Sequence, residues 1–492
     1  MKILKRLGIV SLWLVGILLL IVGVRKNDPV LLALRGPGNL MLCAASLTVA
    51  LVLLWRGGWR GRAWTAKLLV LLWILPSLAM LYEMVDFAIC KRGVLRTEPA
   101  RAQTLGQHFI VGYTSFAEVA RLADKGLIGG IYVTKRNVAG RSVEAVRAEL
   151  AALQARRQAA HLPSLIVAVD QEGGIVSHLS PLLPALPPLS ALASLSPEIR
   201  ARAAEEFGRT HGRSLAALGV NLNFAPVLDL RPEAGRNLFD LNTLIEQRAI
   251  ASDPDIVADI ARAYVQGLEA SGVEATVKHF PGLGRVRGDT HLFDASLDAP
   301  LADLEASDWR PFRQVLAGSK AALMIGHVSL TAIDPDRPAS HSKAVIDGLL
   351  RKEWNFDGLV VTDDLEMGAI YKHDVCRAVA EALNAGADLL LVAYDGAQFY
   401  RLFACASAAD AKGELDAAML VKSEGRLRKF EDALPKVDLS ADSVHLAPHA
   451  AGQSHLKRIR RAISLRPSFE TPAAQAPQDE VFFSRRDIRP SW

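Results

Sequence analysis

Cysteine is scarce in this sequence, and the cysteine spacings that bind metal ions are missing. Only four cysteines occur in 492 residues, at positions 43, 90, 376 and 405. No Cys-x-x-Cys pair is present, which argues against a structural zinc site. Cys376 and Cys405 form a disulfide only if they face an oxidising compartment, and the sequence alone leaves that question open.

A strong charge of either sign is also absent. The chain contains 57 Lys and Arg against 52 Asp and Glu, which leaves a formal net charge of +5 and a pI near 9.0. Many of the basic residues lie beside the apolar N-terminal segments or in the C-terminal run Lys457-Arg458-Ile459-Arg460-Arg461. Charges in such places suit the neighbourhood of a membrane, so the composition does not indicate a nucleic-acid partner.

Three apolar runs near the N-terminus predict a membrane region over residues 1–92. Leu7–Val24 and Asn39–Trp55 contain no charged residue, and each has about the length that crosses a bilayer core, roughly 17–25 residues. Leu68–Tyr82 is shorter and contains Pro76, so it spans only if the acidic residues after it lie at the interface. A cleaved signal peptide is the alternative for the first run, but no small-residue cleavage site follows it.

The distribution of Lys and Arg predicts on which side of the membrane the rest of the chain lies. The loop between the second and third runs carries basic residues at positions 56, 60, 62 and 67 and no acidic residue. Together with the basic N-terminus, this loop is expected in the cytoplasm. Three spans then place the remainder outside the cytoplasm, in a multi-pass protein of the cytoplasmic membrane. With only two spans the assignment reverses.

From about residue 105 the pattern changes to short β-branched runs that alternate with longer helical stretches, which predicts a parallel α/β sheet. The expected strands are His108–Tyr113, Gly129–Val133, Leu165–Asp170, Asn221–Ala225, Ala275–His279, Ala322–His327, Gly358–Thr362 and Leu389–Ala393. Expected helices include Val143–Gln158, Ile199–Leu218, Pro254–Gly272, Lys343–Trp354 and Arg377–Ala385. Eight strand–helix units in roughly 300 residues fit a closed (β/α)₈ TIM-type barrel. An open doubly wound sheet is the alternative, but the glycine-rich phosphate turn that it would need is lacking.

Polar residues stand at or just after the carboxyl ends of several expected strands, where a barrel carries its active site. They are Asp170, Asp229, Lys278, His279, His327, Asp363 and Asp364. Charged groups placed in this way are costly to bury without a purpose. Asp229 or His327 alone is better explained as a strand-end residue in contact with water. Five strands that end alike nevertheless predict a shared pocket.

A loop after the fifth expected strand carries an acid–imidazole pair, Asp289 and His291. In an extended loop, residues two apart point the same way, so Asp289 can orient the ring of His291 and stabilise its protonated form. A mobile proton carrier needs this arrangement. Taken alone, the pair is better explained as part of a surface loop, and the motifs around it favour the catalytic interpretation.

Five motifs, in this order, resemble glycoside hydrolase family 3, and in particular its single-barrel β-N-acetylglucosaminidase branch. They are VAVDQEGG at 167–174, FAPVLD at 224–229, KHFPG at 278–282, DTH at 289–291 and VTDDLEM at 361–367. The resemblance implies a catalytic (β/α)₈ domain over residues 104–434. It does not extend to the membrane region or to residues 435–492, whose composition predicts a basic, disordered tail.

The resemblance implies a retaining reaction with a covalent glycosyl-enzyme intermediate. Asp363 matches the family's nucleophile, and its neighbour Asp364 is expected in a supporting position. Asp289 and His291 match the acid/base dyad of this branch. The implied reaction removes terminal N-acetylglucosamine from cell-wall-derived or related glycans, and no metal or organic cofactor is implied.

The resemblance also implies a set of sugar-binding residues, which are Asp170, Arg248, Lys278 and His279. Two positions depart from the family pattern, because Leu283 replaces a histidine and Ile175 replaces an arginine. These changes bear on loop order, substrate preference and rate. Two alternatives therefore stay open: a family 3 β-glycosidase or phosphorylase of other sugar specificity, and a glycan-binding membrane protein without catalysis.

Overall fold

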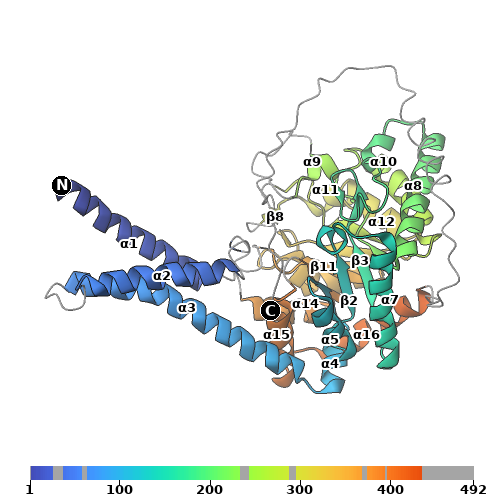
Figure 1. Cartoon of the computed structure of the whole chain (residues 1–492). Helices are drawn as coiled ribbons and strands as arrows, with labels where there is room; N and C mark the ends of the chain where they lie inside the picture. The colour runs from blue at the N-terminus through green and yellow to red at the C-terminus, as the bar shows by residue number, and fades with distance from the viewer. Residues whose placement is uncertain are drawn as a thin grey trace. The chain divides into compact units, whose positions relative to one another are not determined.

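The chain forms a closed barrel of eight parallel strands with helices on its outer side (Figure 1). The computed structural model describes residues 2–25, 31, 37–57, 64–232, 243–286, 295–367, 374–393 and 396–434. Hydrogen bonds connect the strands in the order β1, β2, β3, β6, β7, β9, β11, β12 and back to β1. The predicted (β/α)₈ barrel is therefore confirmed, and the open sheet is excluded.

The barrel strands are short, apolar and almost wholly buried. They are β1 (Phe109–Gly112), β2 (Gly130–Val133), β3 (Ile166–Val169), β6 (Leu222–Asn223), β7 (Glu274–Phe280), β9 (Ala322–Ile325), β11 (Val360–Asp364) and β12 (Leu389–Val392). Each overlaps an expected strand. Their sequences are continuous apolar runs because one face of each strand packs inside the barrel and the other packs against helices. Outside the barrel, β4 (Gln171–Gly173) pairs with β5 (Val176–Ser177), and β8 (Ala295–Leu297) with β10 (Val328–Leu330).

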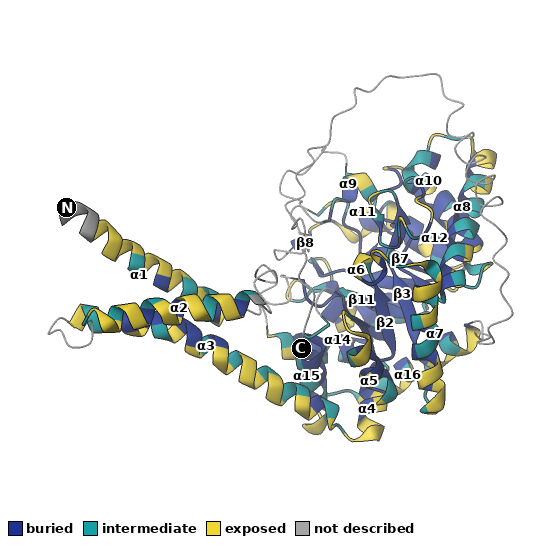
Figure 2. Cartoon of the chain, viewed as in Figure 1, coloured by how far each residue is buried: buried dark blue, intermediate teal, exposed yellow. Residues whose placement is uncertain are grey.

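Helices around the barrel turn their apolar faces inward and their polar faces to solvent (Figure 2). The longer ones are α5 (Phe116–Asp124), α7 (Val143–Ala159), α8 (Pro197–Leu218), α10 (Pro254–Glu269), α14 (Val375–Ala385), α15 (Phe399–Ala411) and α16 (Ala417–Ala433). The shorter ones are α4 (Pro99–Gly106), α6 (Lys135–Val138), α9 (Ile245–Arg248), α11 (Leu301–Ala306) and α12 (Arg310–Leu316). The helix expected over Lys343–Trp354 is a π-helix, Ala344–Glu353.

Local sequence signals explain where these helices begin and end. Side chains of Ser142, Asp253 and Asp416 accept hydrogen bonds from the first backbone N–H groups of α7, α10 and α16. Gly219 ends α8 and Gly386 ends α14, each with the positive φ that a glycine adopts without strain. The capping residues thus mark where the helices begin and end, in addition to the alternation of apolar runs.

Apolar side chains fill the barrel interior below its carboxyl end. Ile110, Ala168, Phe224 and Val361 belong to one buried cluster there, and the ring of Tyr132 stacks on Phe224 with centroids 5.8 Å apart. The barrel is therefore a packed core rather than a pore, and the polar groups above this layer stand on a rigid floor.

Three N-terminal helices are long and apolar enough to cross a membrane. They are α1 (Lys2–Val24), α2 (Pro37–Trp55) and α3 (Trp64–Leu95), and their outward side chains are largely exposed (Figure 2). The first two agree with the expected runs. The third was expected to be short, but the helix continues through Pro76 and past its acidic residues for 32 residues.

The second half of α3 contacts the helix that follows the last barrel strand, α15. Arg401 of α15 donates to Glu83 at 2.8 Å and lies 3.4 Å from Asp86. The ring of Phe87 meets the ring of Tyr400 edge to face, 5.9 Å between centroids. The contacts with Arg401 explain why α3 can contain two acidic residues beyond its most apolar part.

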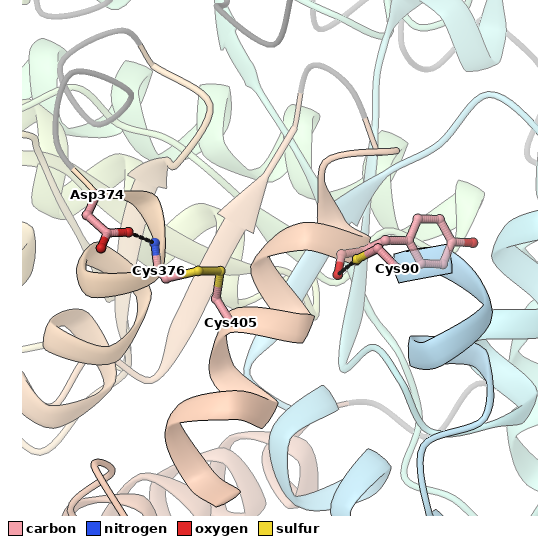
Figure 3. The surroundings of a disulfide bond; sticks show 5 residues. Cys90, Asp374, Cys376 and Cys405 are labelled. Carbon is pink, nitrogen blue, oxygen red and sulfur yellow. Dashed lines mark hydrogen bonds between the residues drawn. A yellow bond between two sulfur atoms is a disulfide. The ribbon is translucent and has the colours of Figure 1, made fainter. Parts of the chain in front are cut away.

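A disulfide joins Cys376 in α14 to Cys405 in α15 (Figure 3). The first of these helices is capped by Asp374, whose carboxylate accepts from the backbone N–H of Cys376 at 3.0 Å. The second helix is the one that contacts α3. The pairing that the sequence left open is therefore present, and it bridges two neighbouring helices of the barrel's outer layer.

Candidate active site

A cavity of about 270 Å³ lies at the carboxyl end of the barrel. Four segments that are distant in sequence contribute the residues predicted for the site: the end of β3, α9, β7 and β11. The predicted residues that line the cavity are Asp170, Arg248, Lys278, His279 and Asp363. The structure thus brings together five of the seven residues predicted for catalysis and binding.

Two cations and two carboxylates form a buried cluster at this cavity, which Asp170, Lys278 and Arg248 line and Glu172 does not. The Lys278 ammonium, which is 2% exposed, contacts Asp170 and lies 2.7 Å from a Glu172 oxygen. The Arg248 guanidinium binds both oxygens of Glu172, at 3.0 and 2.6 Å. Planar, two-point pairing of this kind fixes the orientation of both groups.

Attraction to the cations keeps the two carboxylates of this cluster ionised despite their burial. Burial alone would raise the pKa of Asp170, but the Lys278 ammonium, together with smaller effects from His178 and Tyr132, lowers that pKa to about 2. Burial opposes the charge of Glu172 as well, and Arg248 and Lys278 lower its pKa. At neutral pH the cavity therefore presents the ionised Asp170 carboxylate beside the Lys278 and Arg248 donors, which suits a ligand rich in hydroxyl groups.

A second acid–base contact holds His279. Its Nδ1 lies 2.7 Å from an oxygen of Asp229, and the same carboxylate accepts from the backbone N–H of Leu283 at 2.7 Å. Asp229 is 1% exposed, so the interpretation of this residue as a water-facing strand end was wrong. The Leu283 side chain is itself buried and lines the cavity. The turn after β7 is therefore anchored through its backbone, which the change to leucine leaves intact.

Tyr132 and His178 extend the site beyond the predicted residues. The Tyr132 hydroxyl donates to the second oxygen of Asp170 at 2.7 Å and lies 3.2 Å from Nδ1 of His178. Burial lowers the pKa of His178. Tyr132 was not predicted, because a tyrosine inside an apolar strand resembles a core residue. For Glu172 a signal existed, since it stands two residues after Asp170 on extended backbone.

Asp363 lies near the end of β11 and is half-buried. One of its oxygens accepts a hydrogen bond from the backbone N–H of Asp364 at 2.9 Å. Asp364 itself is buried, and its Oδ1 accepts from the backbone N–H groups of Glu366 and Ala393 at 3.0 and 3.1 Å. Both aspartates line the cavity, and the second also binds the backbone around it through its carboxylate.

Asp289 and His291 lie outside the described residues, which stop at Val286 and resume at Ala295. Their predicted role as an acid/base dyad therefore stays a prediction. In the part of the chain that the structure describes, no group of three or more His, Cys, Asp or Glu side chains is arranged to hold a metal ion.

Carboxylates and fixed cations converge at the carboxyl end of a (β/α)₈ barrel, above an apolar floor, which is the place where barrel enzymes carry their active sites. Comparison with known proteins identifies the class of enzyme. Residues 102–428 match the glycosyl hydrolase family 3 N-terminal domain. The chain belongs to glycosyl hydrolase family 3, and it is a glycoside hydrolase.

Relatives and solved structures agree with this assignment. A β-hexosaminidase of Xylella fastidiosa is 37% identical over 290 residues, which cover 58% of this chain and 82% of the relative. A β-hexosaminidase of Xanthomonas euvesicatoria is 38% identical over 271 residues, with 54% and 77% covered. The structure of a family 3 β-N-acetylglucosaminidase from a Paenibacillus species superposes with a TM-score of 0.64 at 32% identity, covering 73% of this chain and 68% of that one.

Proposed function

We propose that this enzyme is a retaining, exo-acting β-N-acetylglucosaminidase in which Asp363 is the nucleophile. The proposal rests on one observation: Asp363 lines the same cavity as Asp170, Lys278 and Arg248, which belong to the buried charged cluster that Glu172 completes. The names of the relatives, β-hexosaminidase and β-N-acetylglucosaminidase, support the choice of sugar. The cluster binds and orients the terminal sugar, and the carboxylate attacks it.

The reaction proceeds in two displacements. Asp170 accepts hydrogen bonds from sugar hydroxyls while Lys278 and Arg248, which Glu172 holds in place, donate to hydroxyl oxygens, which orients the anomeric carbon. An Asp363 oxygen then forms a bond to that carbon as the bond to the leaving oxygen breaks. A proton donor gives its proton to the leaving oxygen. Water later attacks the same carbon and returns a proton to the donor. The bond to Asp363 breaks, and the released sugar has the original anomeric configuration.

His291 is proposed as the proton donor, and Asp289 as the group that orients it. Retaining enzymes with two carboxylates place them about 5–5.5 Å apart. A second negative charge at that distance would raise the pKa of one carboxyl group. An imidazole, which is neutral when it acts as a base, avoids this repulsion and therefore leaves Asp363 ionised.

Replacement of His291 by alanine is expected to lower kcat/KM by about 10²–10⁴-fold for substrates with poor leaving groups. For an acidic nitrophenol, which departs without a proton, the loss should be much smaller. The measurement is kcat/KM over a series of aryl N-acetyl-β-glucosaminides of rising phenol pKa, which should show a steeper dependence in the variant. The kcat/KM of Asp289→Asn should lie between the values for His291→Ala and the parent enzyme. An equal loss of kcat/KM for every substrate in the series would exclude His291 as the proton donor.

Substrate choice is tested most simply with purified protein and aryl glycosides. The proposal predicts release of the aryl group from an N-acetyl-β-glucosaminide, and at least tenfold slower release from the matching β-glucoside. Adding inorganic phosphate should leave free sugar as the product. Sugar 1-phosphate would instead show a phosphorylase, and sugar binding without turnover would show a non-catalytic glycan-binding protein.

We further propose that α1–α3 anchor the enzyme in the cytoplasmic membrane, with the barrel on the extracytoplasmic side and cell-wall-derived glycans as substrates. The Lys/Arg bias around the apolar runs supports this orientation. The disulfide between Cys376 and Cys405 supports it independently, because disulfides persist in oxidising compartments. The division into a membrane region (1–92), a catalytic domain (104–434) and a tail (435–492) is part of the same proposal.

The proposed orientation predicts that protease added to intact spheroplasts degrades the barrel. In the same cells, Cys376 and Cys405 should react with a maleimide only after denaturation and reduction. A cytoplasmic protein of the same cells serves as the control for intact membranes. If the barrel is protected until detergent is added, and both thiols react without reduction, the barrel lies in the cytoplasm.

A further inference from the structure

A chain of three side chains outside the sugar-binding cluster ends on the nucleophile strand. His327 follows β9 and is 1% exposed, so its interpretation as a water-facing strand-end residue was wrong. Its Nε2 lies 3.0 Å from the backbone oxygen of Asp364, and its Nδ1 lies 2.7 Å from Oγ of Ser340. That hydroxyl lies 3.2 Å from Nδ1 of His341, whose ring stacks on the His327 ring with centroids 5.8 Å apart.

The partners of His327 fix which of its nitrogens carries the proton. A carbonyl oxygen only accepts, so Nε2 must donate to Asp364. In the neutral ring Nδ1 is then an acceptor, and the Ser340 hydroxyl donates to it. The Ser340 oxygen in turn can accept from Nδ1 of His341. The three hydrogen bonds therefore all point the same way, from His341 through Ser340 and His327 to the backbone carbonyl of Asp364.

Asp364 is held through its carbonyl, its carboxylate and its N–H. Its carbonyl accepts from His327, and its carboxylate accepts from the N–H groups of Glu366 and Ala393. Its own N–H donates to the Asp363 carboxylate at 2.9 Å. The residue whose N–H orients the nucleophile is thus itself fixed, and His327 supplies the side-chain contact to its carbonyl.

We propose that His327 is a positioning residue for the nucleophile. It holds the backbone of Asp364 in the place from which the Asp364 N–H aims the Asp363 carboxylate at the anomeric carbon. This inference rests on the proposed function, in which Asp363 attacks the sugar. It predicts a loss in the chemical step rather than in binding, because the residues of the sugar-binding cluster lie after β3 and on β4, β7 and α9, and the cluster does not include the His327 ring.

Two amide variants separate a positioning role from a role in packing alone. In His327→Gln the amide nitrogen reaches about the place of Nε2 and can still donate to Asp364. In His327→Asn it reaches only about the place of Nδ1. We expect His327→Asn to lower kcat by roughly 10²-fold, the effect of a nucleophile displaced by about 1 Å, with KM within about threefold. His327→Gln should keep kcat within about tenfold of the parent enzyme.

Thermal melting first establishes that both variants are folded. If they are folded and share the same kcat, or if the loss appears in KM, the inference is wrong. If His327→Asn does not fold, Ser340→Ala serves instead, with an expected severalfold loss in kcat at unchanged KM, and an unchanged kcat there would overturn the inference. Asp363→Ala is measured alongside. Activity in Asp363→Ala would overturn the proposed function, whereas an inactive Asp363→Ala with a fully active His327→Asn would overturn this inference alone.

Discussion

Replacement of Asp363 by alanine is expected to lower kcat on the order of 10⁴-fold or more, the scale on which enzymes lose activity when a catalytic group is deleted. The other carboxylates at the cavity are engaged elsewhere. Asp170 and Glu172 pair with Lys278 and Arg248, and Asp364 accepts from two backbone N–H groups. None of them can therefore replace the missing nucleophile.

The loss should come without loss of fold, because Asp363 is only half-buried and stands at a strand end. Azide offers a control that distinguishes a missing nucleophile from a damaged site. In the variant it is expected to enter the space left by the carboxylate and to restore part of the turnover, with a glycosyl azide of inverted configuration as the product. Full activity in the variant without azide would refute the assignment of the nucleophile.

Replacement of Glu172 by alanine is expected to cost about 3–5 kcal/mol of the free energy of unfolding, and more than 10²-fold in kcat/KM. The Glu172 side chain is 6% exposed and is shared by Arg248 and Lys278, which are 9% and 2% exposed. Removing it leaves two buried cations with one carboxylate between them. Water cannot compensate for the missing charge at such burial.

The measurement is urea unfolding of the isolated protein in detergent, beside a matched control. Asp357→Ala breaks an ion pair with Lys429 whose two side chains are 66% and 71% exposed. This substitution should lower the free energy of unfolding by no more than about 1 kcal/mol, because solvent screens exposed ion pairs. Similar small losses in both variants would show that the buried cluster does not stabilise the fold as described.

The barrel was predictable from the sequence because each strand is buried on both faces. A parallel strand of this kind appears as an unbroken apolar run, and the caps between runs mark the helices. The length of α3 was not predictable in the same way. Its acidic residues Glu83 and Asp86 argued for an early end of the helix, but Arg401 neutralises them from a position 318 residues beyond Glu83. A partner so distant leaves no local signal.

The predicted site residues converge because strand ends meet at one end of a barrel. Arg248 came only from the resemblance, since nothing in its own surroundings marks it as a ligand. The contacts of Asp229 and His327 were missed for another reason. Besides a side-chain partner, His279 or Ser340, each of them binds a backbone group, the N–H of Leu283 or the carbonyl of Asp364. A side chain that binds backbone needs no complementary residue, so the sequence gives no hint of its role.

In the proposed reaction the Asp363 carboxylate forms a bond to the anomeric carbon of the sugar. Mass spectrometry after incubation with a fluorinated N-acetylglucosaminyl donor, whose second displacement is slow, detects that bond. We expect a digest to contain one peptide heavier by the mass of the sugar, with the added mass on Asp363. A sugar attached to any other residue, or rapid turnover of the natural linkage with no labelled peptide, would contradict it.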